Sequence, residues 1–355
     1  MRFIGNKTKL LSYINDILSK HDALPGSHFF DFFAGTASVG KYFKKKGYIV
    51  SSSDILYFSY VLQRAYIGNT GQPEFKELLN VLPEIGSNKL ISSNYELVLE
   101  YLNDIPGEQG FIYQNYTEEG TKDSPQKRMF FKGDNGKKID AVRRTIEEWH
   151  INAFINEDEY YVLLATIVES VPFYANISGV YAAFLKSYDP RAKKDLMLRP
   201  IDLSSTGPVG EAFNVNSMEI IDDIDTDILY LDPPYNARQY APNYHLLETI
   251  ARYDNPTIKG VAGIRPYADQ KSEFCNKATA IVALDNIAKT AKYKILALSY
   301  NTEGIMAQQD ILKTLSQYGE AQVYEVDYRR FKSNSNGNSE KKTHIKEQLY
   351  ILKPF

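Results

Sequence analysis

Two short segments of the chain group residue types that can carry out chemistry. The first runs from Asp31 to Gly40 and reads Asp-Phe-Phe-Ala-Gly-Thr-Ala-Ser-Val-Gly, with a glycine turn at its centre. The second, Asp232 to Tyr235, reads Asp-Pro-Pro-Tyr and follows the apolar run Ile228 to Leu231. Each segment places a carboxylate near the end of a predicted strand, which is where open α/β sheets bind their ligands.

The Asp-Pro-Pro-Tyr segment suits a planar exocyclic amine. Two consecutive prolines hold the backbone rigid, remove two N–H donors and leave their carbonyl oxygens free. The Asp232 carboxylate and the Pro233 carbonyl can then accept the two hydrogens of the amine, while Tyr235 stacks on its ring. The tetrapeptide alone could be an ordinary turn, but the strand before it and the first segment upstream favour a site.

The first segment suits a cofactor that contains adenosine. Gly35 lets a ligand approach the backbone closely, and the helix predicted after it offers N–H groups at its start. Asp54 lies 19 residues after Gly35, at the end of the next predicted strand. An acid in that place can accept hydrogen bonds from both ribose hydroxyls.

Two other cofactor classes fit this loop less well. Gly35 to Lys41 matches the nucleotide-binding pattern G-x-x-x-x-G-K, but Tyr42 stands where magnesium binding needs Ser or Thr. A dinucleotide-binding loop needs a second glycine, and Thr36-Ala37 stands in its place. The loop therefore favours S-adenosylmethionine, although by itself it also fits an ordinary turn of an α/β protein.

Strands and helices alternate around both segments. We expect strands over residues 28–33, 48–53, 227–231 and 294–299, helices over 36–46, 55–65, 272–291 and 303–317, and a terminal hairpin of 321–328 with 346–352. Strand–helix alternation is the signature of a parallel sheet covered by helices. The fold class that we predict is therefore α/β, with a Rossmann-like sheet.

The alternation stops between the two segments. Gly and Pro residues punctuate the chain after Gly68, helical periods recur at 139–154 and 160–171, and the α/β pattern resumes at Ala212. We therefore expect one catalytic domain made of residues 1–67 and 210–355. Residues 68–209 form an inserted, mostly helical domain.

Basic residues gather within the predicted insertion. Eight of them lie between Lys122 and Arg144, against three Asp, although the net charge of the chain is −3. A local basic face can bind phosphate groups even when the whole protein is nearly neutral. The candidates for DNA contact in this stretch are Lys137, Lys138, Arg143 and Arg144; the same cluster could be ordinary solvated surface.

Composition limits the remaining possibilities. The chain has 355 residues, 43% hydrophobic and 24% charged, which are values of a globular protein of about two domains. Its single cysteine, Cys275, excludes a disulfide scaffold, and no cluster of His, Cys and Asp has the spacing of metal ligands. No apolar run reaches about 20 residues, and the N-terminus has no signal-peptide pattern. We expect a cytoplasmic protein without a metal and without a membrane segment.

Taken together and in this order, the motifs resemble those of the Dam-like, alpha-group amino methyltransferases, which methylate N6 of adenine in DNA. Arg2 to Lys7 resembles the N-terminal cofactor motif of that family, Phe33 to Gly40 its methionine-binding loop, and Asp232 to Tyr235 its catalytic tetrapeptide. Asp54 matches the ribose-binding acid, and Leu298 to Gly304 resembles a later motif near the target base.

The resemblance implies a set of site residues. It assigns catalysis to Asp232, Pro233, Pro234 and Tyr235, and it places the loop after them beside the target base. Arg238 and Tyr240 in that loop are candidates for DNA contact, with phosphate or with the orphaned partner base; the same residues could be an ordinary helix cap before Pro242. It assigns binding of S-adenosylmethionine to Phe3, Lys7, Asp31, Ala34, Gly35, Thr36, Ala37, Ser38, Val39, Asp54, Ile55 and Asp232. The family often has an acid that contacts the cofactor adenine where this chain reads Asn214 to Met218, so Ser217 and Met218 are expected to make that contact.

The resemblance also implies the reaction and its setting. Double-stranded DNA is the expected substrate, the adenine is flipped out of the helix, and a companion restriction endonuclease is a possible partner. Methylation of cytosine N4 or of guanine N2 in RNA stays open, as does an inactive module that binds S-adenosylmethionine and nucleic acid. An NAD-dependent oxidoreductase is disfavoured by the glycine pattern.

Overall fold

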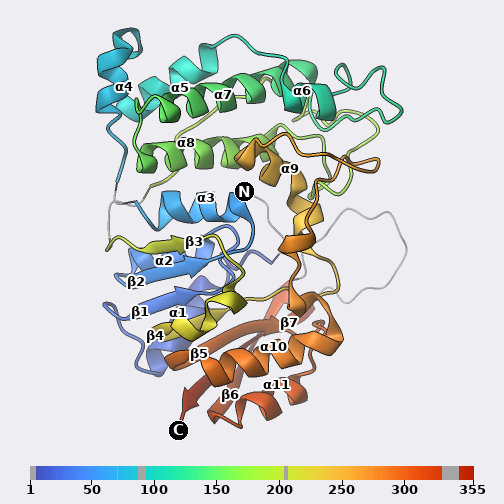
Figure 1. The fold of residues 1–355 in the computed structure, drawn as a ribbon. Helices are drawn as coiled ribbons and strands as arrows, with labels where there is room; N and C mark the ends of the chain where they lie inside the picture. Colours follow the sequence, from blue (N-terminus) through green and yellow to red (C-terminus); the bar gives the residue numbers. More distant parts are fainter. Residues whose placement is uncertain (1–4, 70, 87–92, 204–206, 330–343) are drawn as a thin grey trace. The chain divides into compact units, whose positions relative to one another are not determined.

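Seven strands of the described chain form one mixed sheet (Figure 1). The computed structural model describes residues 5–69, 71–86, 93–203, 207–329 and 344–355. The strand order is β3-β2-β1-β4-β5-β7-β6, and all strands run parallel to β1 except β7. The strands are β1 (His28–Asp31), β2 (Ile49–Ser53), β3 (Glu211–Phe213), β4 (Asp225–Leu231), β5 (Lys292–Asn301), β6 (Gly319–Arg329) and β7 (His344–Pro354).

Successive side chains of the central strands point to opposite faces of the sheet. On one face, Phe29 of β1 stacks on Phe43 and on Tyr230 of β4, with ring centroids 4.3 and 5.8 Å apart. On the other face, Phe30 and Leu229 pair in register and join a buried apolar cluster. Because both faces are buried, the apolar residues at the centre of β1 (29–30) and at the end of β4 (228–231) are consecutive rather than alternating.

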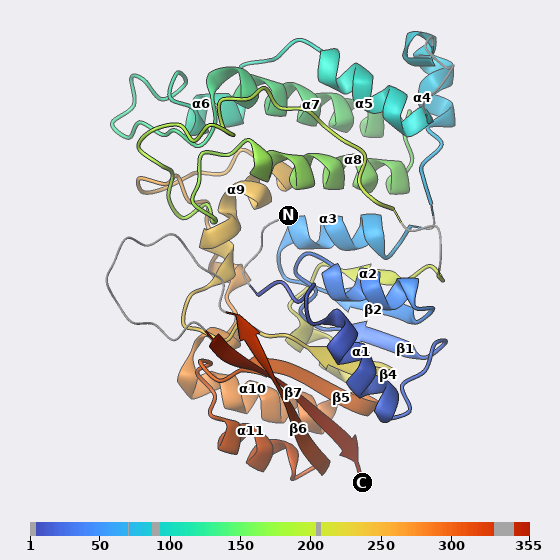
Figure 2. The same cartoon turned by 180° about the vertical axis from the view of Figure 1, so that it is seen from behind.

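Helices cover both faces of this sheet. Figure 2 shows α1 (Leu11–Lys20) and α2 (Ser38–Lys45) on one face, and Figure 1 shows α10 (Lys277–Thr290) and α11 (Gln308–Leu315) on the other. The apolar residues of α10 recur at helical spacing, at Ala280, Leu284 and Ile287, and all three are fully buried. α3 (Tyr57–Tyr66) follows β2. This sheet and its helices fix the carboxyl ends of β1 and β4.

The chain divides into two compact units. One, the sheet unit, comprises the described residues within 5–63, 207–240 and 268–355; the other, the helical unit, comprises those within 64–203 and 241–267. The helices of the helical unit are α4 (Lys76–Val81), α5 (Asn94–Asp104), α6 (Phe111–Tyr116), α7 (Gly133–Ile151), α8 (Glu157–Ser170) and α9 (Tyr240–Arg252). The chain also has short 3-10 helices at Pro83–Gly86, Val171–Phe173, Ser217–Glu219, Ile221–Asp223, Ala268–Gln270 and Glu273–Cys275.

Local sequence signals explain where two helices of the helical unit begin. At α5, the Ser93 hydroxyl accepts from the Glu96 N–H, and Glu96 accepts from the Ser93 N–H; Asn156 and Glu159 do the same at α8. α8 is apolar on nearly all sides, and accordingly most of its residues are buried. Within the described part of this unit, strand pairing is limited to isolated bridges, Thr117 with Phe131 and Lys259 with Ile264.

The expected α/β class and the terminal hairpin are confirmed, since β6 and β7 pair antiparallel along their lengths. The helix expected over 303–317 begins later, at Gln308, because Asn301 closes a turn by accepting from the Glu303 N–H at 3.0 Å. The helical unit takes in residues 241–267 besides the expected insertion, since α9 packs on α7 through the buried Arg143. A target-recognition role for residues 68–209 stays a prediction.

Candidate active site

The two carboxylates expected at strand ends come together at the point where the strand order reverses. β1 and β4 are neighbours, and the chain continues outward from them in opposite directions along the sheet. In such sheets the crevice outside these carboxyl ends is the ligand site. Asp31 ends β1 opposite Tyr230, and Asp232 follows β4 two residues beyond Tyr230. Both carboxylates therefore lie at the carboxyl-terminal end of these two neighbouring parallel strands.

Asp232 lies in a buried cluster of charges. The Lys7 ammonium is 3.4 Å from Asp232 Oδ1 and donates a hydrogen bond of 2.9 Å to Oε2 of Glu347, on β7. Lys7 is 4% exposed and Glu347 is 7% exposed. One ammonium near the start of the chain is thus shared by two carboxylates, one of which lies 340 residues away in the sequence.

Burial sets the protonation of this cluster. The pKa of Asp232 is raised to about 6, first by burial and further by Glu347, and the nearby Lys7 ammonium partly opposes the rise. For Lys7, burial favours the neutral amine, but the charges of Asp232 and Glu347 outweigh it and raise the pKa of the ammonium. The cation therefore persists, and Asp232 is an unusually basic carboxylate.

Asp31 is a second buried carboxylate without a side-chain cation. It is 1% exposed, and neither of its side-chain oxygens accepts a hydrogen bond of normal geometry among the described residues. Burial and the charges of Asp232 and Asp54 raise its pKa well above the ordinary value, and the N–H groups of Gly40 and Phe33 offset only part of that. A buried carboxylate of this kind fits a positively charged ligand group.

The glycine loop after β1 has the conformation that close ligand approach needs. Gly35 and Ala37 adopt left-handed backbone angles, with φ of 50° and 56°. The Thr36 and Ser38 hydroxyls are 2.8 Å apart, and the Asn6 side chain donates to Ser38 at 3.2 Å. Ala34, Ala37 and Val39 are buried. Phe3 lies outside the described residues.

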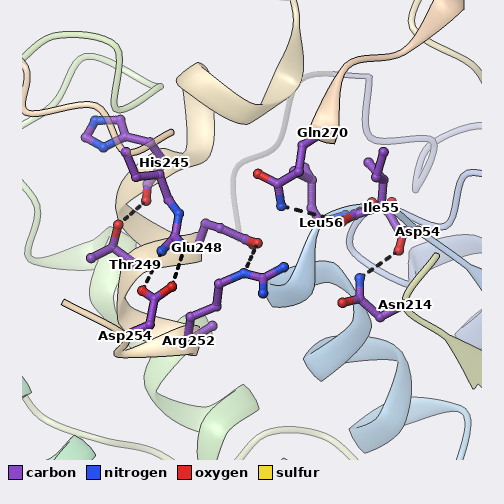
Figure 3. A network of polar contacts seen from close by, with 12 residues as sticks. Asp54, Ile55, Leu56, Asn214, His245, Glu248, Thr249, Arg252, Asp254 and Gln270 are labelled. Atoms are coloured by element: carbon purple, nitrogen blue, oxygen red, sulfur yellow. Dashed lines mark hydrogen bonds and ion pairs between the residues drawn. The ribbon is translucent and has the colours of Figure 1, made fainter. Parts of the chain in front are cut away.

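Asp54 is fixed at the end of β2. Its carboxylate accepts from the Gly35 N–H at 2.8 Å and from the Leu56 N–H at 2.9 Å, and Asn214 donates to its backbone carbonyl at 3.0 Å (Figure 3). The Gln270 amide contacts the carbonyl of Ile55 in the same view. The two backbone hydrogen bonds fix the Asp54 carboxylate beside the glycine loop, at the end of β2.

Ser217 and Met218, expected at the cofactor adenine, differ in their environments. The Ser217 hydroxyl is buried, donates to the Phe32 carbonyl at 2.7 Å and lies 2.8 Å from the Ser53 hydroxyl. Ser217 thus ties the segment after β3 to β1. Met218 is half-buried and packs against the apolar cluster beside α10. Of these two side chains, that of Met218 is therefore the one with exposed surface for a ligand.

The Asp-Pro-Pro-Tyr segment is held from both sides. The Tyr235 carbonyl accepts from the Ile305 N–H at 3.1 Å, and Tyr235 and Tyr240 lie close to Gly5, whose φ is 79°. Within the described chain, the Pro233 carbonyl accepts no hydrogen bond. Burial raises the pKa of Tyr235, so its ring stays neutral. Pro234 is half-buried, and the Arg238 side chain is exposed.

The four basic residues expected to contact DNA occupy different environments. Lys137 pairs with Asp134 at 3.6 Å, and the exposed Arg144 pairs with Glu108. Lys138 donates to carbonyls at the carboxyl end of α5. Arg143 is 1% exposed, and its guanidinium donates to the Ile250 and Ala251 carbonyls of α9. Lys138 and Arg143 are therefore used inside the helical unit.

Sequence reasoning missed Glu347. The only signal is an acid within a strand whose other core positions are apolar, at Leu349 and Ile351. An acid in such a place needs a partner, but its partner Lys7 lies 340 residues away in the chain. No local pattern could have paired the two.

A polar network in the helical unit is also visible in Figure 3, which labels His245, Glu248, Thr249, Arg252 and Asp254. Glu248 is buried and pairs with Arg252, and Thr249 donates to the His245 carbonyl. Burial lowers the pKa of His245 to about 4, so its ring is neutral near pH 7. The network secures α9, and His245 has no acid–base role in it.

The described residues contain no group of His, Cys, Asp and Glu arranged to hold a metal ion. A search of the same residues for a helix long and apolar enough to cross a membrane found none. The cytoplasmic location stays a prediction from the sequence.

Comparison with known proteins adds to this geometry. The sequence profile of the D12 class N6 adenine-specific DNA methyltransferases matches residues 3–314. The chain belongs to this family. The family implies a DNA substrate and a methyl donor. The strand-end carboxylates and the Asp-Pro-Pro-Tyr segment thus lie in a D12-class methyltransferase.

Three relatives show how far the similarity extends. The chain is 38% identical to the type II methyltransferase M.NlaIII of Neisseria lactamica over 357 residues, 99% of each chain. It is 38% identical to M.FokI of Planomicrobium okeanokoites over 339 residues, which are 94% of this chain and 50% of that protein. It is 36% identical to the modification methylase StsI of Streptococcus sanguinis over 360 residues, 100% of this chain and 52% of StsI. The D12-class chain therefore spans about half of M.FokI and StsI, and nearly all of M.NlaIII.

The neighbouring residues Arg143 and Arg144 make a matched pair for a stability test. Arg143→Ala is expected to lower the free energy of unfolding by about 2–4 kcal/mol, because it removes a buried guanidinium that binds two carbonyls. Arg144→Ala is expected to change it by less than about 0.5 kcal/mol, since its ion pair is exposed. Urea denaturation of both variants measures the difference; equal stabilities would contradict the structural role of Arg143.

Proposed function

We propose that this protein transfers a methyl group from S-adenosylmethionine to N6 of adenine in double-stranded DNA, and that it is a Dam-like, alpha-group member of its family. The observation that carries the proposal is the environment of Asp232. The Asp232 carboxylate follows β4, its side chain is 17% exposed, and its pKa is raised to about 6. It lies two residues before Pro234 and three before Tyr235, beside a Pro233 carbonyl whose lone pairs are unused among the described residues. These are two acceptors for the two hydrogens of an amine.

The residues near β1 and β2 fit the proposed cofactor. The buried carboxylate of Asp31 suits the ammonium of the methionine part, and the Asp54 carboxylate, held beside the glycine loop at the end of β2, suits the ribose hydroxyls. Ala34 to Val39 form the wall of this cradle, with Ile55 and Met218 as apolar neighbours for the adenine. When bound, S-adenosylmethionine supplies an electrophilic methyl group.

Asp232 and Pro233 would act on the amine by geometry and charge. The lone pair of adenine N6 is delocalised into the ring, so the amine is a poor nucleophile. Two hydrogen bonds to these acceptors favour a pyramidal nitrogen, and the carboxylate stabilises the positive charge that develops there. Tyr235 stacks on the flipped base and recovers about 1–3 kcal/mol of the stacking lost from the duplex.

Three loops of the helical unit support a phosphate-binding surface. Asn176 ties residues 176–195 to 117–132 by donating to the Met129 carbonyl at 2.9 Å, and Arg128 ties 253–267 to them by donating to the Val261 and Gly260 carbonyls. We call residues 117–132, 176–195 and 253–267 the loop cluster. Its exposed basic residues are Lys122, Lys127, Lys186, Arg191, Lys193, Lys194 and Lys259, against exposed Glu118, Glu119, Asp123, Asp195 and Asp254.

On this proposal the main DNA contacts lie in the loop cluster, and Lys137 and Arg144 of α7 contribute less because they pair with Asp134 and Glu108. Lys138 and Arg143 support the unit from within. Arg238 is exposed near the catalytic segment and, with Tyr240, suits a contact beside the flipped base. The names of the relatives, type II methyltransferases and modification methylases, favour a role in restriction–modification, with an endonuclease of the same specificity as companion.

The reaction itself gives the first test. Incubation with unmethylated plasmid and methyl-labelled S-adenosylmethionine, followed by mass spectrometry of the nucleosides, should place the label in N6-methyladenosine. Asp232→Ala should reduce it by about 10²-fold or more, as expected for loss of a group that stabilises developing charge. Asp227→Asn, at the opposite end of β4 and paired with Lys294, is the matched control and should keep full activity. If the label appeared in N4-methylcytosine, the target base would be cytosine and not the proposed adenine.

Binding of the cofactor can be tested without DNA. Asp54→Ala removes the proposed acceptor of the ribose hydroxyls and the partner of two backbone N–H groups. We expect the dissociation constant for S-adenosylmethionine to rise about 10-fold or more, which corresponds to a loss of at least about 1.4 kcal/mol. Isothermal titration calorimetry measures this dissociation constant. Asp16→Ala, which removes an exposed carboxylate of α1, is the control and should bind like the wild type. If both variants bound S-adenosylmethionine equally well, Asp54 would not be a cofactor-binding residue.

The loop cluster can be tested by salt dependence. Replacement of Lys127, Lys186, Lys193 and Lys194 by Gln should weaken DNA binding. It should also reduce the slope of log affinity against log salt by about 0.9 for each DNA phosphate that the variant no longer neutralises. Arg144→Gln, whose guanidinium already pairs with Glu108, should have a smaller effect. If the quadruple variant kept both affinity and slope, the DNA surface would have to lie elsewhere.

A further inference from the structure

Glu347 is a buried carboxylate that none of the recognised motifs includes. It lies on β7 opposite Asn301 of β5, near the carboxyl ends of the parallel strands. Its Oε2 takes the shorter of the two contacts of the Lys7 ammonium, 2.9 Å against 3.4 Å to Asp232. The Lys7 ammonium therefore interacts with both carboxylates, and its hydrogen bond is the one to Glu347.

The charges around Asp232 come from several elements. Those that face it or share its cluster are Lys7 of the N-terminal segment, Glu347 of β7, Asp31 at the end of β1, Tyr230 of β4 and Tyr235. Lys7 is the only cation among them. Glu347 attracts the Lys7 ammonium at the shorter distance, and its negative charge offsets the effect of Lys7 on Asp232.

We propose that Glu347 is a positioning residue of the methyl transfer: it holds the Lys7 ammonium back from Asp232, so that the Asp232 carboxylate can accept the proton that adenine N6 releases. The proposal rests on the adenine-N6 methylation proposed above. On this proposal the Lys7 ammonium interacts with Asp232 and Glu347, and it does not bind the cofactor as the family resemblance implied.

Methyl transfer to N6 forms one bond, breaks one bond and releases one proton. The N6 lone pair forms the new bond to the methyl carbon, the bond from that carbon to sulfur breaks, and its electron pair stays on sulfur as a neutral thioether. N6 now carries three substituents besides the ring carbon and a positive charge, and one of its two protons passes to a carboxylate oxygen of Asp232. A carboxylate paired fully with an ammonium would be a weaker base for that proton.

A titration of Asp232 tests the charge coupling without DNA or cofactor. In protein labelled with ¹³C at aspartate Cγ, the Asp232 resonance is assigned by its loss in Asp232→Asn, and its chemical shift is followed against pH. Glu347→Gln removes a negative neighbour and releases Lys7 to Asp232. Both changes favour the ionised form, so the midpoint should fall from near pH 6 by about one to three pH units.

The matched control is Glu325→Gln, which removes a carboxylate on the neighbouring strand β6 that pairs with Lys346. Its Asp232 midpoint should equal that of the wild type. If Glu347→Gln does not fold, Glu347→Asp moves the carboxylate back by one methylene and should lower the midpoint in the same direction by less. An unmoved midpoint in the folded Glu347 variants would overturn the proposal.

Single-turnover rates link the titration to the reaction. For Glu347→Gln, the acid limb of the rate against pH should move to lower pH with the titration midpoint, and the plateau rate should fall because Asp232 is a weaker base. A plateau equal to the wild-type rate would reject the role in methyl transfer. Absence of adenine methylation by the wild type would reject the proposed function whatever the titration shows, so the two failures are distinguishable.

Discussion

The centre of the sheet unit depends on one buried ammonium between two carboxylates. Lys7 lies 2.9 Å from Glu347 and 3.4 Å from Asp232, in a place that almost no water reaches. Burial raises the pKa of Asp232, and the nearby Lys7 ammonium partly opposes that rise. The shared cation also joins the N-terminal segment, β4 and β7 where the catalytic segment begins.

The same constraint on buried charge shapes the rest of the sheet unit. Asp31 has no side-chain cation among the described residues, whereas the Asp54 carboxylate accepts from two backbone N–H groups of the loops that it holds in place. Ser217 ties the segment after β3 to β1 through the Phe32 carbonyl and the Ser53 hydroxyl. The carboxylates proposed to bind the cofactor thus lie among polar groups that hold the frame.

Basic residues of the helical unit divide in a similar way. Lys138 and Arg143 bind the carbonyls at the ends of α5 and α9, where a cation also meets the negative end of the helix dipole. The lysines of the loop cluster are exposed instead. A run of basic residues in sequence was enough to suggest a phosphate surface, but it could not say which members face inward, because that depends on which helix ends pack against α7.

The sequence by itself determined the α/β class, the terminal hairpin and the two strand-end segments, because apolar periodicity and glycine or proline turns act over a few residues and are legible locally. It also pointed to Asp31, Asp54 and Asp232 through their places after strands. The tertiary structure alone decided the partners of these groups. Glu347 meets Lys7 across 340 positions of the chain, and residues 241–267 join the helical unit, because burial and charge act through space and not along the sequence.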